Sequence, residues 1–501
     1  MLPWTLITMA QTESTVNPVF TNIFEDPKVD DSVFERVEAV VKTPSGHNVN
    51  GLSSTNLSFQ ISDKNSVKDL SEAYILLNVR LTKLDGSELT YTGAGATLAE
   101  TSFEMVGNNM APIKSMKLSI GGMTVESVDR AFLRGLICSM LEKRTNDPKV
   151  QSEWFYPEID DKDERGLISG ANPSYIARIT RRNGAKSIVT SRPNKTLELR
   201  IPLKDCFGFV RDNTAGILGQ EIVIDIGLAD VGFGVQKSYI EVVDGAAKTN
   251  AVGDVRLYVS GAELWYHTYT PSSKIGAELL GIINNPTDRP KFTRAWVQHE
   301  VIQLGSISEE ASSVTFTMPQ KYSRYGRVYI FAMSEPKKNS NTHQVYNSTQ
   351  FDQVKWTNMS LSINGSKSFP TNPYQMDWTN RAVTRQYSAL VEAQRVAEME
   401  QTGVVDFESF LKTYPIVVFD ISSPGQALTD QTTQTTVTLD CRWETTPVVQ
   451  PGYPVITNST GIEALTANDR RYTIYACVEL HRYLSGFGDN GSTVFDQLST
   501  Q

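Results

Sequence analysis

The sequence is poor in the residues that most often carry catalysis or hold metal ions. Its four cysteines, Cys138, Cys206, Cys441 and Cys477, form no CxxC pair. This spacing indicates neither a disulfide framework nor a zinc site and favours free, buried thiols. The five histidines are scattered, and no HExxH, Gly-x-Ser-x-Gly or Ser/His/Asp spacing occurs. We therefore predict a protein that is not an enzyme and has no catalytic residues, metal site or cofactor.

Long apolar runs and a surplus of positive charge are also missing. No stretch of about 18 apolar residues occurs, so the sequence predicts no membrane-spanning helix. The formal net charge is −9, which argues against direct, strong binding of nucleic acid. The first 33 residues carry five acidic side chains against Lys28 alone. We expect this N-terminal arm not to be a basic genome-binding tail.

Two charged segments are candidates for binding sites. The acidic run at 158–166 has Arg165 where a calcium loop needs an oxygen ligand, so a solvated loop is the better interpretation. The basic cluster Arg178, Arg181, Arg182, Lys186 and Arg192 is the one patch that could meet phosphate or an acidic neighbour. A contact between subunits is at least as good an explanation of it as DNA.

What the sequence does have is strand-type alternation along most of its length. Short runs of Val, Ile, Thr, Tyr and Phe with period 2 are bounded by Gly, Pro, Asn and Ser, a pattern typical of β-strands. At 501 residues the chain is long enough for two β-rich domains of roughly 200–250 residues each. The first series of expected strands is 34–42, 57–61, 74–82, 116–125, 197–203, 222–228 and 255–266. The second is 292–304, 314–318, 328–333, 359–363, 416–421, 437–443 and 472–483.

The two series match each other in order. The matched segments are 57–61 with 314–318, 74–76 with 329–331, 116–122 with 359–365, 129–134 with 380–385, and 262–264 with 478–480. Any one match is weak, but five in the same order with drifting offsets indicate a duplicated domain whose loops have changed length.

Turns and helices repeat as well. Gly121-Gly122 and Asn364-Gly365 are expected to supply the positive φ angles of tight hairpins. A helix is expected after each hairpin, at 129–141 with Asp129 as its cap, and at about 377–402. The segment 269–273 is the expected linker between the two copies.

Local motifs add a resemblance to a known family. The sequence has Leu199-Arg200-Ile201-Pro202-Leu203, then Phe207-Gly208-Phe209, then a strand from Leu218 to Ile224. This succession resembles the late first domain of the double jelly-roll viral major capsid proteins, at the Polinton-like, adintovirus and virophage end of a group that includes hexon. The hairpin at 355–370 and the Arg/Tyr helix from Arg381 to Tyr387 resemble the same family.

The resemblance implies an all-β fold of two tandem eight-stranded antiparallel jelly rolls with short helical insertions. The expected division is an N-terminal arm at 1–33, jelly rolls at 34–269 and 291–488, a linker at 270–290 and a tail at 489–501. The assembly candidates are Arg130, Arg134, Arg381, Arg385, Pro202, Phe207, Gly208, Phe209, Gly122 and Gly365. Arg130 and Arg381 are expected to anchor equivalent helices, with a solvated helix face as the alternative.

The function implied is a major capsid protein of an icosahedral DNA virus, located in the virion shell. Its partners would be further copies of itself, first as a homotrimer and then as neighbouring trimers, together with penton and minor capsid proteins. A membrane inside the shell is compatible with this arrangement. The alternative is a carbohydrate-binding or carbohydrate-active β-sandwich, because jelly rolls also host lectins.

Overall fold

Most of the strand-forming part of the chain is described by a computed structural model. The described residues are 33–42, 56–63, 66–83, 87, 103–143, 153–155, 197–214, 216–217, 220–229, 234–237, 241–243, 246–248, 255–274, 277, 293–307, 313–318, 325–334, 348–365, 367–378, 380–394, 405–421, 436–443 and 472–485. The N-terminal arm, the acidic run, the basic cluster and the C-terminal tail lie outside these residues.

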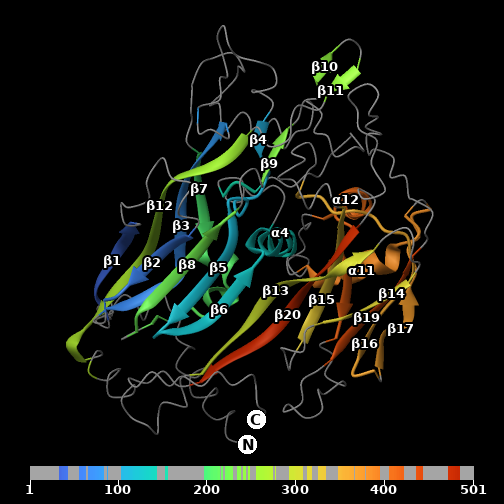
Figure 1. Cartoon of the computed structure of the whole chain (residues 1–501). Coiled ribbons are helices and arrows are strands. Elements are labelled where there is room, and N and C mark those ends of the chain that lie inside the picture. The colour runs from blue at the N-terminus through green and yellow to red at the C-terminus, as the bar shows by residue number, and fades with distance from the viewer. Residues whose placement is uncertain are drawn as a thin grey trace, which may run out of the picture.

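The first half of the chain forms a sandwich of two four-stranded antiparallel sheets (Figure 1). One sheet has the order β1 (Val33–Lys42), β12 (Val255–Pro271), β3 (Val67–Lys83) and β7 (Leu197–Pro202). The other has the order β2 (Asn56–Ile61), β8 (Ile222–Leu228), β5 (Ile113–Ile120) and β6 (Met123–Asp129). Successive strands of these eight alternate between the two sheets except at the β5–β6 hairpin, which is the order expected of a jelly roll.

The second half repeats this topology. Its sheets are β13 (Thr293–Ile307), β20 (Tyr472–Ser485), β15 (Tyr325–Ser334) and β18 (Val417–Asp420), and β14 (Ser313–Thr317), β19 (Val437–Trp443), β16 (Trp356–Ile363) and β17 (Lys367–Tyr374). Small pairings complete the described strands, β4 (Phe103–Met105) with β9 (Val235–Lys237) and β10 (Glu241–Val243) with β11 (Ala246–Lys248).

Alternation along each strand builds the cores. In β2 every second residue is buried, with Leu57, Phe59 and Ile61 facing inward, as the period of a strand requires. The buried apolar side chains of both sandwiches belong to one continuous cluster. The two sandwiches are therefore packed on each other, with β13 and β20 beside α4 (Ala131–Glu142) (Figure 1).

Strand pairing confirms the matches of 57–61 with 314–318 and of 116–122 with 359–365, and it corrects a third. Phe59 pairs with Ile224 and Phe316 with Leu439, the same positions of the two copies. The hairpin residues have matching positive φ angles, 59° and 81° at Gly121-Gly122 and 50° and 69° at Asn364-Gly365. The match of 74–76 with 329–331 is out of register, because Ile75 pairs with Leu264 whereas the counterpart Leu480 pairs with Tyr325. Short segments with alternating apolar residues match each other at several registers, so the sequence alone does not determine the register of this strand pair.

Local expectations at the helices and the linker need correction. Asp129 is the last residue of β6 and does not cap α4, whose N-cap is Arg130 with φ 55°. The second helix, α11, spans only Thr384–Ala393 among the described residues, and 395–404 lie outside them. The expected linker begins too early, because 269–271 extend β12 and pair with β1. Three short helices were not expected, α7 (Leu203–Cys206), α8 (Gly208–Asp212) and α12 (Phe407–Lys412).

Candidate functional site: the junction between the two sandwiches

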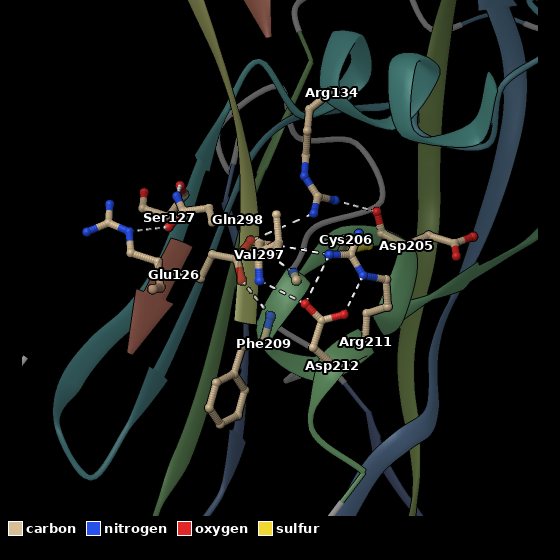
Figure 2. A network of polar contacts seen from close by, with 12 residues as sticks. Glu126, Ser127, Arg134, Asp205, Cys206, Phe209, Arg211, Asp212, Val297 and Gln298 are labelled. Carbon is tan, nitrogen blue, oxygen red and sulfur yellow. Dashed lines mark hydrogen bonds and ion pairs between the residues drawn. The ribbon is translucent and has the colours of Figure 1, made fainter. Parts of the chain in front are cut away.

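A network of charged and polar side chains lies where the two sandwiches meet (Figure 2). The second sandwich contributes β13, which among the described strands pairs with β20 alone. The first contributes the end of β6, α4 and α8. An open strand edge exposes a row of unpaired N–H and C=O groups, which a fold has to cover or blunt.

Two adjacent residues of α8 cover this edge of β13. The backbone N–H of Val297 donates to Oδ2 of Asp212 at 2.8 Å, and Nη2 of Arg211 donates to the carbonyl oxygen of Val297 at 2.9 Å. An acceptor and a donor thereby replace a neighbouring strand. Arg211 also donates to Glu142 at 2.7 Å and to Asp212 at 2.8 Å, and these carboxylates raise its pKa although burial opposes this.

The close approach of α8 to β13 requires glycine at position 208. A Cβ atom built there would lie 2.0 Å from the carbonyl oxygen of Val297. The backbone that crowds Gly208 belongs to the second sandwich. Next to it Phe209 meets Trp296 edge to face, with ring centroids 5.2 Å apart. The Phe-Gly-Phe motif therefore lies at the junction.

A buried ion pair, Glu126 with Arg134, lies against the start of α8. The carboxylate of Glu126 accepts the backbone N–H groups of Gly208 at 3.1 Å and Phe209 at 3.0 Å, and lies 3.7 Å from Nη2 of Arg134. Burial raises the pKa of Glu126, and Arg134 acts in the opposite direction. Arg134 in turn donates to the carbonyl oxygen of Asp205. Both side chains of the pair are buried, so each compensates a charge that would otherwise be stranded.

Further hydrogen bonds cross the junction after Val297 along β13. Gln298 donates to the carbonyl oxygen of Ser127 at 3.2 Å and accepts from Arg482 at 3.1 Å. Arg130 donates to the carbonyl oxygen of Val301 at 3.2 Å. The contacts thus run along β13 and fix its register against the first sandwich.

A second ion pair lies within the second sandwich, beside α4. Nε2 of His299 is 3.4 Å from Oε1 of Glu479, which also accepts from the hydroxyl of Tyr329 at 2.6 Å. Burial alone would lower the pKa of His299, but Cys138 of α4 and Glu479 raise it to about 9. Burial alone would raise the pKa of Glu479, but His299 and Tyr329 lower it to about 2.

The sequence candidates divide between this junction and other places. Arg130, Arg134, Gly208 and Phe209 lie at the junction, with Phe207 buried beside them. Pro202 ends β7 and precedes α7. Gly122 and Gly365 form hairpin turns. Arg381 and Arg385 lie on the second sandwich and are exposed.

Sequence reasoning missed Glu126, Arg211 and Asp212. The adjacent Arg-Asp pair carries no pattern, because such pairs are common on solvated surfaces and its partner is a backbone group 85 residues away. The four cysteines are free and buried, as expected. Among the described residues no cluster of three metal-ligating side chains occurs, and no helix of that part of the chain is long and apolar enough to cross a membrane.

Comparisons with known proteins agree with this topology. A family model described as a double jelly roll-like domain matches residues 274–459. A chain from the structure of the Sputnik virophage superposes with a TM-score of 0.55 at 11% identity, over 94% of this chain and 90% of that chain. The chain has the double jelly-roll fold. The expected fold class is thereby confirmed.

Two other solved structures superpose less closely. The PBCV-1 protein VP54 has a TM-score of 0.49 at 9% identity, covering 94% of this chain and 99% of that chain. The mavirus major capsid protein has a TM-score of 0.47 at 10% identity, covering 96% and 93%. A comparison with curated protein sequences found no match. The fold assignment therefore depends on the strand order, the family model and the Sputnik chain.

Proposed function

We propose that this protein is the major capsid protein of a virus, and that three copies form a pseudo-hexameric tile of an icosahedral shell. The observation that carries the proposal is the pair of similar jelly rolls locked together within one chain. Each chain supplies two corners of nearly equal shape, so three chains supply six. A six-cornered tile can cover a flat facet by repeating the same contacts.

The junction suits such a role because it makes the two corners one rigid part. Its connections are a glycine packed against backbone, a buried ion pair and an edge strand covered by side chains. A tile that meets several neighbours needs a fixed angle between its corners, whereas a hinge between domains would spread the angles. We assign the protein to the virion shell, with copies of itself and minor capsid proteins as partners.

The proposal is tested by oligomeric state and shape. Purified full-length protein should sediment as a trimer at micromolar concentration and appear in negative-stain images as a six-cornered particle. Specific interfaces of this kind bury more than about 1,000 Å², so the trimer should survive dilution. A stable monomer at all concentrations would contradict the proposal, and specific sugar binding by that monomer would favour the carbohydrate alternative.

A further inference from the structure

Two buried ion pairs flank one cysteine at the junction. In the first jelly roll, Glu126 lies 3.7 Å from Nη2 of Arg134. In the second, Nε2 of His299 lies 3.4 Å from Oε1 of Glu479. The cationic member of each pair also acts on the thiol of Cys138. Cys138 is four residues after Arg134 in α4, so the two side chains lie on the same face of that helix.

Each of the two cations leaves one buried nitrogen atom to be accounted for. Within the described part of the chain, no oxygen or nitrogen atom pairs with Nε of Arg134 or with Nδ1 of His299, and these side chains are only 1% and 2% exposed. Buried polar atoms are nearly always hydrogen-bonded. Because Nε2 of His299 is directed at Glu479, Nδ1 is the ring nitrogen left for α4, where the imidazole meets the thiol of Cys138.

An ionised thiol at Cys138 accounts for both nitrogen atoms. A thiolate accepts hydrogen bonds and supplies negative charge between two cations. Burial alone would raise the pKa of Cys138, but the His299 imidazolium and the Arg134 guanidinium lower it. Burial raises the pKa of the other three thiols, to about 12 for Cys441. Cys138 is therefore the cysteine that its surroundings favour as an anion.

The remaining charged groups around Cys138 come from three elements. Glu142 on the same helix disfavours the thiolate, but it forms an ion pair with Arg211 at 2.7 Å. Arg211 of α8 itself interacts favourably with a thiolate at this position. Cys477 of β20 has its own pKa raised, first by burial and then by Cys138, so it stays a neutral thiol. The nearby cations thus dominate the surroundings of Cys138.

We propose that Cys138 is a thiolate that bridges Arg134 and His299 across the junction, and that it is a site of oxidation by small peroxides. Cys138 is 5% exposed, whereas Cys441 is 2% exposed and the other two cysteines are fully buried. The thiolate attacks one oxygen of hydrogen peroxide: the S–O bond forms, the O–O bond breaks, and the leaving hydroxide takes a proton from the His299 imidazolium. The products are a sulfenic acid, a neutral imidazole and water, so sulfur is oxidised and the peroxide is reduced.

Oxidation removes the negative charge that joins the two jelly rolls at this point. The sulfenic acid is neutral and adds an oxygen atom to a packed interior, which strains its surroundings. Arg134 and His299 lose the group between them, so the contact of α4 with β13 weakens while the chain stays intact. The site is formed within a single chain and goes beyond the proposed capsid role, so it is tested whatever the oligomeric state of the protein.

Peroxide treatment of the full-length protein tests the site directly. After exposure to hydrogen peroxide at pH 7, catalase is added and the protein is unfolded with dimedone, which caps sulfenic acids. Peptide mass spectrometry then identifies the capped cysteine. Cys138 should be capped at least about tenfold faster than any other cysteine, because the thiolate is the reactive form. Equal capping of all four cysteines, or none at Cys138, would overturn the proposal.

The variant His299→Gln separates activation of the thiol from simple burial. Loss of the imidazole should slow capping of Cys138 about tenfold at pH 7 and make its rate rise with pH, since the thiol then has to ionise first. If His299 only fills space, the substitution opens the junction, and capping stays the same or becomes faster; either result would overturn the proposal. Glu263→Gln, at the matching position of Glu479 in the first jelly roll, is the control and should react like the parent.

Melting temperature measures the consequence for the junction. Peroxide should lower the melting temperature of the parent by several degrees. Cys138→Ser carries no charge at neutral pH, so it should melt below the parent without peroxide and should not respond to peroxide. Cys441→Ser, at a buried thiol of the second jelly roll, should keep the response. A response that persists in Cys138→Ser would place the sensitive residue elsewhere and contradict the proposal.

Discussion

The two jelly rolls share a local plan but place its charged residues in opposite surroundings. Arg134 is 1% exposed and faces Glu126, whereas its counterpart Arg385 is exposed, lies over the ring of Tyr374 and donates to the carbonyl oxygen of Asn372. The difference arises because α4 of the first jelly roll is covered by β13, while nothing in the described part of the chain covers α11 in that way. The same residue type at the same position is structural in one copy and available for contacts in the other.

The largest expected effect tests this contrast at the ion pairs. Glu126→Ala leaves Arg134 buried without its partner and removes the acceptor of two backbone N–H groups, so unfolding in urea should require about 3–5 kcal/mol less free energy. Glu408→Ala removes the partner of Arg381 at the exposed position and should cost about 0–1 kcal/mol. Equal losses in the two variants would show that the copies do not differ as described.

Glycine substitutions sharpen the comparison between close packing and turn geometry. Gly208→Ala places a methyl group against the Val297 carbonyl and should destabilise the protein by about 1–3 kcal/mol. Gly122→Ala and Gly365→Ala have no atom within 4 Å of the new Cβ but require φ of +81° and +69°, which costs about 1 kcal/mol. Thermal unfolding of the three variants should therefore separate Gly208 from a matched pair.

The paired arginines test the same contrast. Arg130→Ala removes a hydrogen bond from a charged donor across the junction and should cost about 1.5–3 kcal/mol. Arg381→Ala should change the stability of the isolated subunit by about 0–1 kcal/mol and should instead lower the yield of trimers. Similar losses of subunit stability in the two variants would return both residues to a common anchoring role.

The fold was predictable because the alternation of each strand and the repeat of the two domains can be recognised in short segments of the sequence. Short sequence motifs predict both hairpins, at Gly121-Gly122 and Asn364-Gly365. They also predict the strands around Phe59 and Phe316. The junction was only partly predictable. Gly208 and the arginines stood out as motifs, but Glu126 and Asp212 become meaningful only when β13 is brought beside α8, and no local pattern encodes that contact.

The last comparison concerns pH and the His299–Glu479 pair. The pKa of His299 is raised to about 9 from an ordinary 6.5, so its contribution to stability is complete below pH 6.5 and is lost as pH rises through 9. The pKa of Glu479 is lowered to about 2 from 4.5, so its contribution is present above pH 4.5 and is lost as pH falls through 2. The pair should therefore stabilise the second jelly roll most between pH 4.5 and 6.5.

Urea midpoints measured from pH 6 to 9.5 should decline for the parent protein and decline less for His299→Gln, because the variant has no imidazole to deprotonate. The matching position of the first jelly roll supplies the control. Glu263→Gln should leave the slope over this range unchanged, since it keeps both His299 and Glu479 in place. A parent profile that is flat across this range, or as steep in His299→Gln as in the parent, would show that the buried imidazole is neutral and that the contact with Glu479 is an ordinary hydrogen bond.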